Sequence, residues 1–85
     1  MTDIEVEALL TQVALGTVTA KTAIALLVLK GEDRDQAARL TFYALGGRDA
    51  TEVGPDGRAR YAGSGKLVSE VERAIAEALG ERALG

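Results

Sequence analysis

The sequence predicts an all-α or mostly α fold, a small bundle of three to four helices with a glycine-rich loop or short β-hairpin before the last helix. Apolar residues recur at helical spacing near both ends of the chain. Capping residues and glycines divide the first 45 residues into three short helical segments. Six of the ten glycines and the only proline lie between residues 46 and 65. An 85-residue chain makes one small domain, which we divide into a helical core at 1–45, the loop or hairpin at 46–65 and a C-terminal helix at 66–82.

The first helix is predicted from about Asp3 to Leu15. Thr2 and Glu5 have the spacing of a capping box, in which Thr2 is the N-cap. Gly16 suits the position just beyond the end of the helix, because glycine adopts the left-handed conformation found there. The apolar stripe that the helix would bury has the spacing i, i+3, i+4 and i+7 and consists of Val6, Leu9, Leu10 and Val13.

The second helix is predicted to follow an N-cap at Thr19 and to end at about Lys30, before Gly31. Its residues 23–29 are apolar without interruption, so they surround about two helical turns completely. A helix that is apolar all round must be covered on every side, by the rest of the chain or by a second copy. The other predicted stripes are narrow and rich in alanine, and we therefore expect a homodimer.

The third helix is predicted over 32–45, with Asp33 and Gln36 at capping-box spacing and Gly46–Gly47 at its end. Together with the second helix it forms either an antiparallel helical hairpin or a helix-turn-helix that binds nucleic acid. In the second case Arg34, Gln36 and Arg39 are the candidate readers of bases. The acidic opening of this helix would repel phosphate, which favours the helical hairpin.

Residues 46–65 are predicted to form either a small hairpin or a mobile loop. Gly54–Gly57 has proline at the second turn position and glycine at the fourth, as a type I turn prefers. Thr51–Val53 and Arg58–Tyr61 would be the two arms. The last helix is expected to begin at Ser64 or Gly65 and to bury one face, formed by Val68, Val71, Ile75 and Leu79.

The composition excludes many functions. Without cysteine the chain has no disulfide and no zinc–thiolate site, and without histidine it lacks the commonest general base and metal ligand. We assign no catalytic residue, cofactor or metal, and do not expect an enzyme. The net charge of −3 is spread evenly along the chain, which argues against nucleic-acid binding. The N-terminus is acidic, unlike a secretory signal, and the apolar run is too short to span a membrane, so we expect a soluble cytoplasmic protein.

The segment Arg60–Leu67 resembles a phosphate-binding loop only superficially. A P-loop has glycine at the first position and a hydroxyl residue after the lysine, where this chain has Arg60 and Leu67. Two interpretations of this segment remain. It forms either a weaker anion site, built from backbone N–H groups and Lys66, or an ordinary flexible entry into a helix. Arg58 and Arg60 are further candidates for contact with nucleic acid or anions, although neighbouring acids nearly cancel their charge.

These observations lead us to expect a non-enzymatic protein-interaction or assembly module, such as a small bacterial or phage adaptor, inhibitor or structural accessory protein. The composition, rich in alanine, glycine and arginine, is typical of GC-rich bacterial and phage genomes. The expected partner is another protein or a second copy of the chain. We do not expect the protein to bind a membrane. The alternative is a helix-turn-helix regulator that binds nucleic acid. The candidate interface residues are Leu26, Leu27, Leu29, Phe42, Tyr43 and Tyr61.

Overall fold

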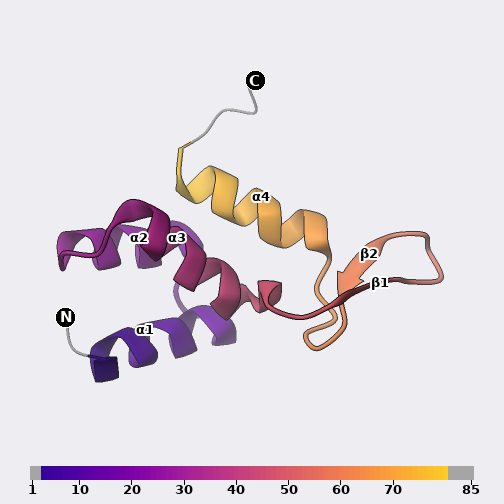
Figure 1. Ribbon diagram of the computed structural model, residues 1–85, viewed down its shortest axis with the longest axis horizontal. Helices are drawn as coiled ribbons and strands as arrows, with labels where there is room; N and C mark the ends of the chain where they lie inside the picture. Colours follow the sequence, from indigo (N-terminus) through magenta and orange to yellow (C-terminus); the bar gives the residue numbers. More distant parts are fainter. Residues whose placement is uncertain (1–2, 81–85) are drawn as a thin grey trace.

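The computed structural model describes residues 3–80 and confirms the predicted fold class, a mostly helical domain with a small hairpin before the last helix (Figure 1). The helices form one body, and the hairpin projects from one end of it. In chain order the elements are α1 (Asp3–Leu15), α2 (Ala20–Leu29), α3 (Arg34–Phe42), the π-helical turn η1 (Tyr43–Gly47), β1 (Thr51–Val53), β2 (Ala59–Tyr61) and α4 (Val68–Ala78).

Side-chain caps begin α2 and α3 where the sequence predicts them. The Thr19 hydroxyl oxygen accepts the backbone N–H of Thr22 at 3.2 Å, and the Asp33 carboxylate accepts that of Gln36 at 3.4 Å. Each bond pairs one of the N–H groups that a helix start leaves without a partner. The predicted cap at Thr2 lies outside the described residues.

The third helix is shorter than the predicted range of 32–45. It begins at Arg34, directly after the predicted cap Asp33, and after Phe42 it widens into the π-helical turn η1. Gly46 lies within η1 at a φ of 103°, a left-handed conformation that favours glycine. A Cβ atom on Gly47 would collide with the Phe42 ring, so the chain approaches this ring closely.

The hydrophobic core lies around α2, which contacts α1, α3 and α4. Leu27 and Ala23 on α2 and Ala37 on α3 are fully buried. Ile75 on α4 and Leu79, the residue that follows α4, pack against this hydrophobic core cluster. The remaining buried members of the cluster are Leu9, Val13, Ile24 and Ala38.

Residues 51–61 form the hairpin rather than a mobile loop. Thr51 pairs with Tyr61 and Val53 with Ala59, and the Gly57 N–H donates to the Gly54 carbonyl at 2.9 Å to close the turn. An isolated hairpin of this size is marginally stable in water. Here the body of the protein supports it, because β2 contacts α4 and Tyr61 is buried.

The last helix begins at Val68, later than the predicted start at Ser64 or Gly65. The intervening residues fold back on the hairpin instead. The Tyr61 N–H donates to the Lys66 carbonyl at 2.9 Å, and Leu67 forms an isolated antiparallel bridge with Arg60. Residues 81 and 82 of the predicted helix lie outside the described residues. Within residues 3–80, every helix is too short or too polar to cross a membrane.

Candidate interaction surface

The chain covers only one side of its apolar second helix. Ala20, Ala23, Ile24 and Leu27 of α2 are buried, but Leu29 on the opposite side is 79% exposed. Leu26 and Val28, at the borders between the two sides, are 38% and 41% exposed. One chain therefore does not cover this helix on every side, as the narrow stripes of the other helices led us to expect, and the outer side of α2 remains apolar.

Helix α1 carries a second apolar stripe, which faces away from the core. Its buried stripe contains Leu9 and Val13, as predicted. The other stripe, which we call the outer stripe, consists of Ile4, Ala8, Thr11 and Leu15, all of them exposed. Ile4 is 79% exposed and Leu15 is 73% exposed. Large apolar side chains at this exposure are unusual enough, when they form a stripe, to mark an interaction surface.

Two grooves flank α1. The first has a volume of about 440 Å³ and lies between α1 and the α3–η1 segment. Two charged residues, Glu7 and Arg48, line this groove. The other lining residues are Leu10, Thr11, Ala14, Leu40, Tyr43 and Ala44. The second groove, of about 310 Å³, lies between α1 and α2 and is lined by Glu5, Ala8, Leu9, Gln12, Leu26 and Lys30. The outer stripe is therefore a ridge with a groove on each side.

The six residues predicted for an interface lie in four different environments. Leu29 is on the outer side of α2 and Leu26 at the border of that side, and the half-exposed Tyr43 lines the first groove. Leu27 is fully buried and contributes to the core. Phe42 and Tyr61 pack against each other, with Tyr61 only 5% exposed. Leu26, Leu29 and Tyr43 are the exposed residues among the six.

The three candidate readers on α3 do not form a basic face. The Arg34 guanidinium donates to the Leu79 carbonyl at the end of α4, which ties it to the neighbouring helix. Gln36 and Arg39 are exposed, but Asp35 is also exposed on the same helix. A recognition helix presents donors to bases at its N-terminal end, whereas here the first arginine of α3 is bound to the chain and an exposed acid follows it.

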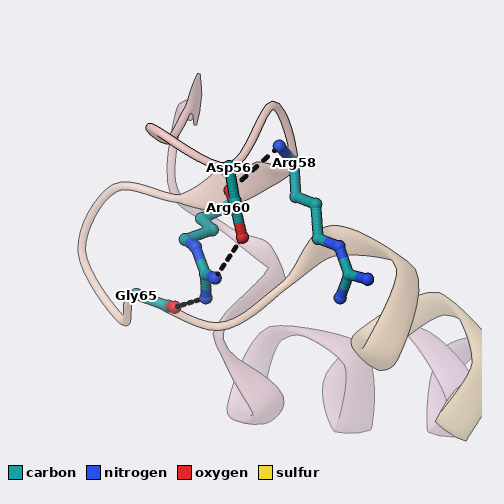
Figure 2. Close-up of polar contacts among 4 residues, drawn as sticks. All are labelled: Asp56, Arg58, Arg60 and Gly65. Carbon is teal, nitrogen blue, oxygen red and sulfur yellow. Dashed lines mark hydrogen bonds and ion pairs between the residues drawn. The ribbon is translucent and has the colours of Figure 1, made fainter.

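The hairpin holds one of its two arginines in an internal contact, as Figure 2 shows. The Arg60 guanidinium donates to the Asp56 carboxylate at 3.0 Å and to the Gly65 carbonyl at 3.4 Å. The Arg58 backbone N–H donates to the same carboxylate at 3.1 Å, while its side chain leads away (Figure 2). The bond from the Arg58 N–H, followed by the charge and hydrogen bond of Arg60, lowers the pKa of Asp56. These contacts stabilise the turn and neutralise one positive charge.

The candidate anion site at Lys66 is largely occupied by the chain itself. The Lys66 N–H donates to the Ser64 hydroxyl at 3.3 Å, and the Gly65 N–H donates to the Tyr61 carbonyl at 2.8 Å. Two of the backbone donors expected to hold an anion therefore already have partners.

Burial raises the pKa of the Tyr61 phenol, and the negative charge of Glu72 raises it further. This shift makes the phenol a poorer acid, which suits a structural residue. Among residues 3–80 no cluster of three or more acidic side chains has the arrangement of a metal site.

The outer stripe is the feature that sequence reasoning missed. Its spacing of i, i+4, i+7 and i+11 can be seen in the sequence. It was missed because another stripe was sufficient to predict the helix, that of Val6, Leu9, Leu10 and Val13. Comparison of the chain with protein-family models, curated proteins and solved structures finds no match.

Proposed function

We propose that this protein is a non-enzymatic interaction or assembly module that self-associates, of the kind that serves as a small bacterial or phage adaptor, inhibitor or structural accessory protein. One observation carries the proposal: two neighbouring helices, α1 and α2, expose large aliphatic side chains on their outer sides. Small chains bury a low fraction of their surface and commonly gain stability by oligomerisation. Covering these side chains with another protein surface removes them from water.

The proposal is tested by the mass of the protein in solution, measured by light scattering behind a sizing column over a range of concentrations and at two salt levels. We expect a mass that approaches twice the 8.9 kDa of one chain as the concentration rises. Higher salt should strengthen or preserve the dimer if apolar contact dominates. A mass of one chain at every concentration, without exposed apolar surface detectable by dye binding, would refute the proposal.

The alternative, a helix-turn-helix regulator, receives less support from the described contacts. Arg34 binds the end of α4, and Arg60 binds Asp56, so two of the predicted cations have partners within the chain. Binding to duplex DNA that weakens steeply with salt would favour this alternative, because contacts with phosphate release counterions.

A further inference from the structure

We infer that a second copy of this chain lays its α1 antiparallel across the outer stripe of α1, so that Arg48 of each copy faces Glu7 of the other. This inference rests on the proposed function and names the surface that performs it. It is carried by the spacing of the stripe, by the order of its large and small side chains, and by the distribution of charge around it.

The spacing of the outer stripe is that of a helix–helix seam. Ile4, Ala8, Thr11 and Leu15 follow one another at intervals of four, three and four residues, the a and d positions of a heptad repeat. The one hydroxyl in the stripe is satisfied internally, because Thr11 donates to the Glu7 carbonyl at 2.8 Å. A partner helix therefore meets no unpaired polar group along this seam.

The order of side chains suits an antiparallel pair. A two-fold axis through the middle of the stripe places Ile4 against the partner's Leu15 and Ala8 against the partner's Thr11. The large side chains then meet at the two ends, and the small ones lie at the centre, where the helix axes approach most closely. Each seam position contacts a different seam position of the other copy, so the surface is complementary to itself.

The charges on α1 also favour the antiparallel arrangement. The first turn of α1 contains Asp3 and Glu5, and the last turn has no basic residue. Parallel packing would bring two acidic first turns together, whereas antiparallel packing places each beside the C-terminal end of the other helix. Antiparallel packing also brings opposite ends of the helix dipoles together.

Arg48 provides the positive charge at the other end of the seam. It follows η1, which contacts α1, and in Figure 1 this part of the chain lies toward the C-terminal end of α1. Glu7 and Arg48 line the same groove, but their side chains form no ion pair within residues 3–80. The two-fold axis of an antiparallel pair puts this groove of both copies on the same side of the seam. Arg48 of one copy then lies opposite the acidic half of the partner's α1.

The size of the seam predicts a reversible dimer. A helix of 13 residues is about 20 Å long, so the contact is limited to roughly four turns and the flanking grooves. This places the interface at the low end of the range for specific complexes. We therefore expect monomer and dimer to exchange and the dimer to dominate at high concentration.

Disulfide trapping tests the pairing directly, because the natural sequence contains no cysteine. We would prepare Ile4→Cys with a heavy-nitrogen label and Leu15→Cys without it, oxidise each alone and both together, and weigh the products by mass spectrometry. Antiparallel packing predicts that the mixed disulfide exceeds either symmetric one at least tenfold. In that packing two identical cysteines lie about 16 Å apart along the axis, beyond the roughly 7 Å that a disulfide spans. Val53→Cys, an exposed apolar position on the hairpin, is the matched control.

The charge contact has its own test. Arg48→Glu should raise the dissociation constant of the dimer at least threefold, and adding Glu7→Arg should restore it.

In the disulfide experiment, symmetric disulfides in excess would overturn the inference in favour of parallel packing. A wild-type dimer that traps no disulfide at either position would overturn the inference but leave the proposed function intact. A wild-type chain that stays monomeric at all concentrations would overturn the inference, and it would refute the proposed function as well if dye binding detects no exposed apolar surface.

Discussion

The ring of Tyr61 meets the ring of Phe42 edge to face, with centroids 6.1 Å apart and planes at 88°. Tyr61 is the last residue of β2 and Phe42 the last of α3, so this contact joins the hairpin to the helical body. Edge-to-face packing is a favoured geometry for aromatic pairs and adds about 1 kcal/mol to the burial of the rings. The contact explains how a hairpin with two three-residue strands stays in place.

Removing this ring should destabilise the fold. For Tyr61→Ala we expect the free energy of unfolding to fall by about 3 kcal/mol, because a buried aromatic side chain is lost. The matched control is Tyr43→Ala, since Tyr43 is 44% exposed and its loss should cost well under half as much. Urea denaturation of both variants measures the difference. Equal losses would show that Tyr61 does not anchor the hairpin.

The pKa of Tyr61 predicts the response to alkaline conditions. Burial, aided by Glu72, raises the pKa of Tyr61 in the folded state above its value in the unfolded chain. The phenol's contribution to the free energy of unfolding is therefore fully present below its pKa in the unfolded chain, about 10. This contribution is lost as the pH rises through the pKa of the folded state. Ultraviolet titration of the Tyr43→Phe variant, in which Tyr61 is the only tyrosine, should give a midpoint above that measured in urea. A midpoint at or below the urea value would contradict the burial of this phenol.

Close packing of η1 predicts unequal effects of two glycine substitutions. A Cβ on Gly47 would strike the Phe42 ring, and one on Gly63 would strike the end of the flexible Asp49 side chain. Gly47→Ala should therefore cost about 2 kcal/mol of stability, whereas Asp49 can move aside for Gly63→Ala at little cost. Thermal unfolding of the two variants compares them. The prediction fails if Gly63→Ala proves as destabilising as Gly47→Ala.

Thr41 predicts a stabilising substitution. Its side chain is fully buried, and its hydroxyl oxygen has no hydrogen-bond partner. Thr41→Val has nearly the same shape and removes the unpaired group, so we expect a gain of about 1 kcal/mol. The same change at Thr19 removes a helix cap and should cost about 1 kcal/mol. Chemical denaturation should give opposite signs for the two variants, and a loss at both sites would mean that the Thr41 hydroxyl is satisfied in solution.

Much of the fold follows from local signals in the sequence. The first helix ends at Leu15, as predicted. The caps at Thr19 and Asp33 form the predicted bonds, because capping depends on residues only three positions apart. The π-helical turn and the late start of α4 could not be predicted in this way. Both lie where distant residues come together, since Ser64 leaves no room for a Cβ atom on Gly46 and the Phe42 ring packs against that of Tyr61.

The candidate surface was harder to predict than the fold. In a continuous apolar run every residue suits the core equally, so the sequence could not separate the buried Leu27 from the exposed Leu29. Only the placement of the neighbouring helices decides which side of α2 is covered. In α1, two apolar stripes share one short helix, and spacing alone does not show which of them faces the core.

The most direct test of self-association through α1 is the mass of the wild-type chain beside that of Leu15→Lys, measured by light scattering over the same concentration series. Leu29→Lys, an equally drastic change at an exposed leucine of α2, is the control. We predict that the wild-type chain and Leu29→Lys dimerise alike, and that Leu15→Lys needs at least ten times the concentration to do so. A Leu15→Lys variant that dimerises as readily as the wild-type chain would contradict the account.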